Sequence, residues 1–307
     1  EIDPIVGVSF TGLFDFFVHA FGSEWLEWMM EGRPDDGRRA SVFRTSEQLY
    51  LSRWRTAARK AVIHYCGQNN IRLPNRITTV QPAGTKSLLT GASSGWHPPK
   101  AQRFIRRITL GVNDPLVPAL MEYGFSVIPA QSARDDEGNL LDDITDPRVQ
   151  EVLVEIPTEV SWANLPGCDQ FNLADLPVEA QYGLYMQVQD HYTDHNTSAT
   201  IELREHEIDT LSELIYETIQ EDGGYISAAL LARFDANETF PRLPFEPISK
   251  EKYDSLVEIN WVSRLSDDFL KILNEYDNED WSIESVAGCQ SAACLEKAEK
   301  DSREKGV

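Results

Sequence analysis

Cysteine, basic charge and long apolar runs are all scarce in this chain of 307 residues. Four cysteines are too few for a disulfide-stapled fold, so we expect a reducing, cytoplasmic setting. No stretch approaches the roughly 18 consecutive apolar residues of a membrane-spanning helix, which excludes an integral membrane protein. The front of the chain also lacks the basic and then apolar pattern of a secretory signal.

Negative charge dominates, since 50 acidic and 28 basic residues give a formal net charge of −22. This balance argues against a general nucleic-acid-binding protein. The charge is uneven: residues 1–130 hold 11 acidic and 15 basic side chains, whereas residues 131–307 hold 39 and 13. We therefore expect any bound anion in the first part, and we interpret most of the acidic charge in the second as a solvated surface.

Strand-like and helix-like patterns alternate over the first 220 or so residues. The clearest helix is predicted to begin after Ser46, a good N-cap residue, and to end near Asn69. Further strands are predicted at 77–80, 104–110, 152–156 and 197–203, and further helices at 115–123, 176–192 and 205–221. The alternation predicts an α/β fold with a mainly parallel sheet or barrel, in which ligands lie at the carboxyl ends of strands.

The pattern changes beyond about residue 223, where the chain reads as helical, with Ser249 as the predicted N-cap of a helix that runs to Asn260. From residue 275 the chain is acidic and poor in core residues, a composition that does not offset the entropy cost of ordering. We therefore expect an α/β part at residues 1–222, a helical region at 223–274 and a flexible tail at 275–307.

A turn rich in proline, glycine and hydroxyl groups follows the strand predicted at 77–80. It consists of Pro82, Ala83, Gly84, Thr85, Lys86 and Ser87. Backbone amides at a helix start, hydroxyl groups and the Lys86 charge suit a phosphate group, although the Walker spacing is absent. A purely structural turn is the alternative, and the three arginines between residues 103 and 107 favour phosphate.

Cys289 and Cys294 form a second candidate site near the end of the chain. The four small or polar residues between them allow a small disulfide ring, and on a mobile acidic linker such a pair could reduce a distant disulfide by thiol exchange. Half of a zinc site and incidental cysteines are the alternatives. His191 and His195 lack the glutamate of a zinc-protease helix, so we do not expect a metal there.

Four segments, taken in order, resemble the C-terminal half of adenosylcobalamin-dependent (class II) ribonucleotide reductases, and most closely the monomeric ribonucleoside-triphosphate type. They are residues 5–13, residues 79–99 with the Pro82–Ser87 turn, residues 191–201, and the pair Cys289 and Cys294. The resemblance spans essentially the whole chain. It implies the second half of a ten-stranded α/β barrel, followed by a helical C-terminal region and a flexible tail.

The resemblance also implies a mechanism. In the family a cobalamin-generated thiyl radical abstracts the ribose 3′-hydrogen, and two barrel cysteines reduce the 2′ position. The Pro82–Ser87 turn would then hold the phosphates of a ribonucleotide, expected to be a triphosphate. Cys289 and Cys294 would reduce the barrel disulfide and be reduced in turn by a thioredoxin-type protein.

One family feature is missing, since the Asn-x-Cys-x-Glu finger loop does not occur and neither Cys66 nor Cys168 fits it. The chain also begins at Glu1 rather than at methionine. We therefore expect a fragment, or one half of a split reductase, that is inactive without its N-terminal half. A class I reductase fragment and a non-catalytic nucleotide-binding module are the alternatives.

Overall fold

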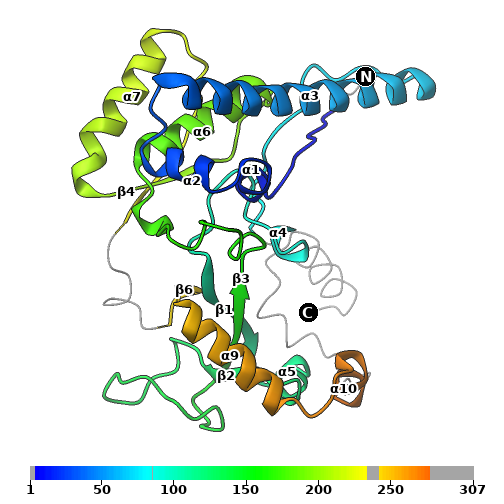
Figure 1. The fold of residues 1–307 in the computed structure, drawn as a ribbon. Coiled ribbons are helices and arrows are strands. Elements are labelled where there is room, and N and C mark those ends of the chain that lie inside the picture. Colours follow the sequence, from blue (N-terminus) through cyan, green and yellow to red (C-terminus); the bar gives the residue numbers. More distant parts are fainter. Residues whose placement is uncertain (1–3, 85, 234–241, 277–307) are drawn as a thin grey trace. The chain divides into compact units, whose positions relative to one another are not determined.

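The computed structural model describes residues 4–84, 86–233 and 242–276 (Figure 1). Contacts divide the chain into two compact units, Glu1–Gln102 with Glu159–Asp235, and Arg103–Thr158 with Ala236–Val307. The predicted division by function, at residues 222 and 274, stays a prediction. Among the described helices, none has both the length and the apolar character needed to cross a membrane.

The first unit is mostly helical, and its helix α6 contacts α3, α7 and the strand β4 (Figure 1). Its elements are α1 (Leu13–Phe21), α2 (Ser23–Met30), α3 (Gly37–Asn69), α4 (Lys86–Leu89), η1 (Leu173–Asp175), α6 (Val178–His191), β4 (Thr200–Leu203), η2 (Glu205–Glu207), α7 (Ile208–Gln220) and β5 (Ala229–Ala232). The predicted helices at 176–192 and 205–221 are therefore confirmed as α6 and α7.

Extended segments of the first unit run parallel to one another. Residues 77–80 lie between two neighbours, since Val8 forms a parallel bridge with Thr78 and Thr197 forms one with Val80. The Thr197 segment continues into β4, which pairs in parallel with β5. The expected parallel arrangement is therefore present in this unit.

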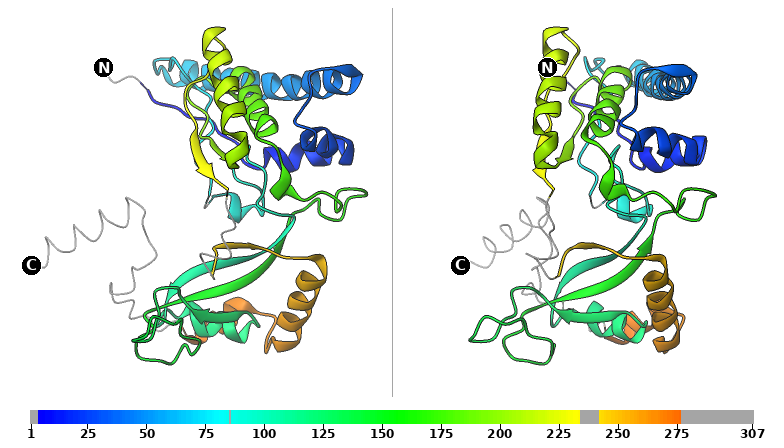
Figure 2. Two further views of the ribbon diagram at one scale, coloured as in Figure 1. Left: turned by 90° about the vertical axis from the view of Figure 1, so that its left-hand side faces the viewer. Right: turned by 60° about the vertical axis from the view of Figure 1, so that its left-hand side comes forward.

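The second unit has a four-stranded sheet in the order β2-β3-β1-β6, and α9 contacts β1 (Figure 2). Its elements are β1 (Arg103–Gly111), α5 (Leu116–Glu122), β2 (Ser126–Pro129), β3 (Glu151–Glu159), β6 (Phe245–Pro247), α9 (Lys250–Ser263) and α10 (Phe269–Tyr276).

The expectation of a mainly parallel sheet is wrong for this unit, because β2 pairs antiparallel with β3 and β1 pairs antiparallel with β6. The strands predicted at 104–110 and 152–156 exist as β1 and β3, but β2 and β6 are too short to give a clear sequence pattern. The region predicted to be helical from residue 223 likewise contains the strands β5 and β6 as well as α9 and α10.

The sequence predicted two helix ends correctly and one wrongly. Helix α3 begins at Gly37, so Ser46 lies inside it and the predicted N-cap is wrong. Its end at Asn69 is confirmed, and Asn70 adopts the left-handed conformation that often follows a helix, with φ of 52°. The predicted N-cap of α9 is also confirmed, since Ser249 Oγ accepts a hydrogen bond from Lys252 N at 3.2 Å.

A buried ion pair lies in the aromatic core of the first unit. Arg33 donates to both oxygens of Glu47, at 3.0 and 2.8 Å, and Trp25 Nε1 donates to Glu47 Oε1 at 2.7 Å. The Arg33 guanidinium also lies over the Trp28 ring, 4.5 Å from its centroid. Three donors on one carboxylate offset the cost of burying its charge, and they link α2, α3 and the turn that connects them.

Replacing Glu47 with Gln should therefore destabilise the protein by about 3 kcal/mol, because Arg33 would be left buried without a counter-charge. Urea denaturation measures the free energy of unfolding. The control is Glu27→Gln, which removes an exposed ion pair with Arg39 and should cost less than about 1 kcal/mol. Equal losses in the two variants would contradict a structural role for the buried pair.

Candidate functional site

The Pro82–Ser87 turn leaves the carboxyl end of the central parallel segment. Val8 N donates to Ile77 O at 2.8 Å, and on the other side Ser198 N donates to Val80 O at 2.8 Å. The strand is thus paired on both sides up to Val80, and the turn starts where the pairing stops. This is the edge at which α/β folds bind their ligands.

Ser87 stabilises the turn from within. Ser87 N donates to Ala83 O at 2.9 Å, and Ser87 Oγ donates to Gly84 O at 3.2 Å. Both Ser87 and Ala83 are buried. The amide and hydroxyl of Ser87, which were expected to be available to a phosphate, are therefore engaged within the turn.

The remaining turn residues face solvent or lie outside the description. Pro82, Gly84 and Lys86 are exposed, and Lys86 Nζ donates to Gln81 Oε1 at 3.1 Å. Thr85 lies outside the described residues. Lys86 is the first residue of α4, so its ammonium group is the positive charge that this turn presents at the surface.

A second turn, residues 91–97, packs against the residues that follow the Val8 segment. Thr11 Oγ1 donates to Ser93 O at 2.8 Å and accepts from Gly95 N at 2.9 Å. The buried carboxylate of Asp15 accepts from Ser93 N at 2.6 Å and from Trp162 Nε1 at 2.8 Å. These bonds attach the chain that follows the Pro82–Ser87 turn to the carboxyl end of a neighbouring segment.

Asp194 fixes the opposite, amino-terminal end of the central strand. Its Oδ1 accepts from Arg55 and Arg59 on α3, at 2.5 Å each, and its Oδ2 accepts from Ile77 N at 3.1 Å. Burial raises the pKa of this carboxyl, but the hydrogen bonds from Arg59, Arg55 and Ile77 outweigh burial and hold the pKa well below its ordinary value. Asp194 is therefore ionised and joins α3 to the start of the strand.

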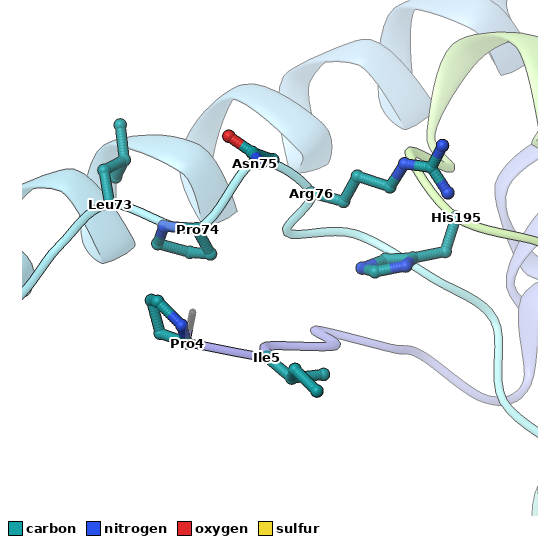
Figure 3. A pocket seen from close by; sticks show the side chains of 7 residues that line it. All are labelled: Pro4, Ile5, Leu73, Pro74, Asn75, Arg76 and His195. Carbon is teal, nitrogen blue, oxygen red and sulfur yellow. The ribbon is translucent and has the colours of Figure 1, made fainter. Parts of the chain in front are cut away.

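A cavity of about 340 Å³ lies beside the amino ends of the same segments (Figure 3). It is lined by Pro4, Ile5, Leu73, Pro74, Asn75, Arg76 and His195. Ile5 precedes Val8, and Arg76 and His195 precede the segments at 77–80 and 197–203. The cavity is therefore at the far end of the strands from the Pro82–Ser87 turn, and it is not part of the predicted phosphate site.

The cysteines divide into two groups. Cys289 and Cys294, the predicted redox pair, lie outside the described residues. Cys66 and Cys168 are free and buried. Burial, followed by the charge of Asp169, raises the pKa of the Cys168 thiol, so this thiol stays protonated and unreactive.

No metal centre is found among the described side chains, where no group of three or more His, Cys, Asp or Glu could hold an ion. Helix α6 ends at His191, so His191 and His195 do not share a helical face.

Asp15 and Asp194 were not singled out from the sequence as site residues. Both act through contacts with residues that are remote in the chain, such as Trp162 and Arg55, so no local pattern marks them. Arg55 and Arg59 are four residues apart and therefore lie on one face of α3, which lets both reach Asp194.

These features define an α/β protein with a partly exposed turn at the carboxyl edge of parallel strands. No family model matches the chain. Curated proteins named adenosylcobalamin-dependent ribonucleoside-triphosphate reductase do match: that of Levilactobacillus brevis is 23% identical over 292 residues, covering 94% of this chain and 36% of the relative. That of Euglena gracilis is 28% identical over 255 residues, covering 82% of this chain and 28% of the relative.

The fold is similar to that of a solved protein structure. The crystal structure of a B12-dependent (class II) ribonucleotide reductase superposes with a TM-score of 0.60 and 23% identity, covering 78% of this chain and 29% of that one. Over most of its length the chain is therefore similar to the adenosylcobalamin-dependent ribonucleoside-triphosphate reductases, and the resemblance found in the sequence is confirmed. It spans about a third of the length of these curated relatives.

Replacing Asp194 with Asn should lower the free energy of unfolding at pH 7 by about 2 kcal/mol, because Arg55 and Arg59 lose their anionic acceptor. The folded-state pKa of Asp194 is depressed, so its contribution is present above the ordinary value of 3.8 and is lost as pH falls further. The variant should thus show a shallower loss of stability below that pH in urea titrations. Glu213→Gln, on the exposed face of α7, is the control and should leave this pH dependence unchanged. If Asp194→Asn lost stability with falling pH as steeply as the unmodified protein, Asp194 would not have the stabilising role described here.

Proposed function

We propose that this chain is the C-terminal part of a ribonucleotide reductase that uses adenosylcobalamin, and that it holds the phosphates of the substrate. The observation that carries the proposal is the position of the Pro82–Ser87 turn at the carboxyl end of the central parallel strand. The names of the relatives support a ribonucleoside triphosphate as substrate and adenosylcobalamin as cofactor.

The turn would bind the triphosphate mainly through backbone amides and one cation. Exposed Gly84 lets the backbone approach a ligand, and Lys86 supplies positive charge at the surface. Ser87 would act indirectly, because its amide and hydroxyl already hold the shape of the turn. The excess of basic over acidic residues in the first 130 residues supports an anionic ligand in this part.

Bound adenosylcobalamin would supply the radical that starts the reaction. The described residues hold no thiol on which the radical could form, since Cys66 and Cys168 are buried and neither belongs to the turns at the carboxyl edge. The thiyl-forming cysteine and the barrel dithiol would come from the complementary part of the enzyme.

The exposed edges of the parallel sheet support the proposal that another part of the enzyme pairs with them. Val8 N and Val8 O both bond to the 77–79 segment, so the backbone groups of Gly7 and Ser9 point to the other side of that edge strand. At the opposite edge all four residues of β5 are exposed. Parallel sheets are normally covered and their edges protected, which is why we propose that the N-terminal half of the reductase completes a ten-stranded barrel here.

Cys289 and Cys294 would carry electrons to the complementary part. Their spacing in the sequence allows a reversible disulfide, and a thioredoxin-type protein would regenerate the dithiol. This part of the proposal rests on the sequence and on the resemblance, because both cysteines lie outside the described residues.

Lys86→Gln should weaken the binding of inorganic tripolyphosphate to the full chain roughly tenfold, which corresponds to about 1.4 kcal/mol. Isothermal titration calorimetry measures the dissociation constant. Lys252→Gln removes an exposed lysine from α9 in the second unit and should leave the affinity unchanged. Absence of binding to the unmodified chain, or equal weakening by both variants, would refute the phosphate role of the turn.

Cys289→Ser should abolish multiple turnover with thioredoxin but preserve turnover with dithiothreitol, in enzyme reconstituted with the N-terminal half and adenosylcobalamin. The reason is that a small dithiol can reach the barrel disulfide without a protein-borne relay. Formation of deoxyribonucleotide over time measures both activities, and Cys66→Ser is the control. Equal losses with both reductants would count against the relay. Activity that requires a di-iron subunit in place of cobalamin would indicate a class I enzyme.

A further inference from the structure

In the first unit, the 77–80 segment and the Thr197 segment stop pairing at the point where the Pro82–Ser87 turn begins. Within the described residues, the bond from Ser198 N to Val80 O is the final backbone bond between these two segments. The Thr197 segment nevertheless continues through β4 to Leu203. On its other side β4 bonds to β5, since Ala199 O accepts from Ala229 N and Leu203 O accepts from Arg233 N.

Because backbone groups alternate along a strand, Ser198, Thr200 and Glu202 face the side that the central strand has left. Their N–H and C=O groups would be unpaired there unless something replaced the strand. Such groups are costly when they are buried without a partner.

Side chains occupy this edge in place of a strand. Trp96 Nε1 donates to Ser198 O at 2.9 Å, and His97 Nε2 accepts from Thr200 N at 2.9 Å. A neighbouring parallel strand would make the same pair of bonds, one donated to residue i and one accepted from residue i+2. Gln181 continues the series from α6, since its Oε1 accepts from Glu202 N at 3.0 Å and its Nε2 donates to Glu202 O at 2.8 Å.

The partners of His97 define its tautomer. Its Nδ1 lies 3.0 Å from Ser94 O, which can only accept, so Nδ1 carries the proton. Thr200 N–H can only donate, so Nε2 is unprotonated. The ring also stacks on buried Trp96, with centroids 4.4 Å apart. Burial, with a smaller contribution from Lys100, lowers the pKa of His97, which agrees with a neutral ring.

We propose that His97 is a positioning residue for the phosphate site: its neutral ring takes the place of a strand at Thr200 and holds the second turn, residues 91–97, in register with the carboxyl ends of the parallel segments. This inference rests on the proposed function of the Pro82–Ser87 turn. The two turns are joined directly, because Ala92 N donates to Ser87 O at 3.0 Å. A loose second turn would therefore change the position of Ser87 and of the turn that Ser87 stabilises.

The test uses the full chain and three variants. His97→Phe keeps an aromatic ring against Trp96 but removes both hydrogen bonds, His97→Gln keeps an oxygen that can accept from Thr200 N, and His64→Phe changes an exposed histidine of α3. Hydrogen exchange of the Thr200 amide, followed by NMR, reports the bond itself. Calorimetry with inorganic tripolyphosphate reports its effect on the site.

We expect Thr200 exchange to accelerate at least tenfold in His97→Phe and to return towards the original rate in His97→Gln. Tripolyphosphate should bind about fivefold more weakly to His97→Phe, with substantial recovery in His97→Gln and no change in His64→Phe. If His97→Phe does not fold, His97→Asn serves instead, since its shorter side chain does not reach Thr200.

Unchanged exchange at Thr200 in His97→Phe would overturn the proposal. Faster exchange with unchanged tripolyphosphate affinity would also overturn it, because the bond would exist without positioning the site. Failure of the original chain to bind tripolyphosphate would overturn the positioning role together with the phosphate function. Faster Thr200 exchange in His97→Phe would then show that the His97 bond exists and that it is the phosphate role of the Pro82–Ser87 turn that is wrong.

Discussion

The pairing of residues 77–80 on both sides is the constraint on which the first unit depends. Val8 and Thr197 flank this short segment, so its backbone groups are satisfied up to Val80 and its direction is the same as that of its neighbours. The Pro82–Ser87 turn begins where this pairing stops, at Val80. The candidate site is thus a consequence of where a backbone ladder ends.

Three buried carboxylates hold the rest of the unit around this ladder. Glu47 joins α3 to α2, Asp15 joins α1 to the second turn and to Trp162, and Asp194 joins α3 to the start of the central strand. Each carboxylate accepts at least two hydrogen bonds, and each joins segments that are separate in the chain. A charge buried with several donors is costly to displace, so these contacts select one arrangement of helices around the strands.

The proposal that this chain is one part of a larger reductase agrees with the exposed edges of its parallel sheet. The chain corresponds to about a third of its curated relatives, and Val8 at one edge of its parallel sheet and all four residues of β5 at the other are exposed. The inner side of β4 is different, since Trp96, His97 and Gln181 already satisfy it. A complementary polypeptide could therefore add strands at the outer edges without closing the opening at which the turn lies.

Several elements of this protein could be predicted from its sequence, because helix periodicity, helix caps and turns depend on residues that are close together in the chain. Helical periodicity located α6 and α7, Ser249 marked the start of α9, and the proline and glycine turn after residue 80 marked a strand end. The order of four sequence segments was enough to recognise the group of proteins to which the chain is similar.

Only the tertiary structure decided the orientation of β2 and β6, the start of α3, and the roles of Asp15, Asp194 and His97. The same holds for Ser87, which sequence reasoning assigned to a ligand but which bonds within its own turn. These features depend on partners that are distant along the chain, such as Thr200 for His97 and Arg55 for Asp194. A local pattern carries no information about such partners, because folding rather than sequence spacing brings them within hydrogen-bond distance.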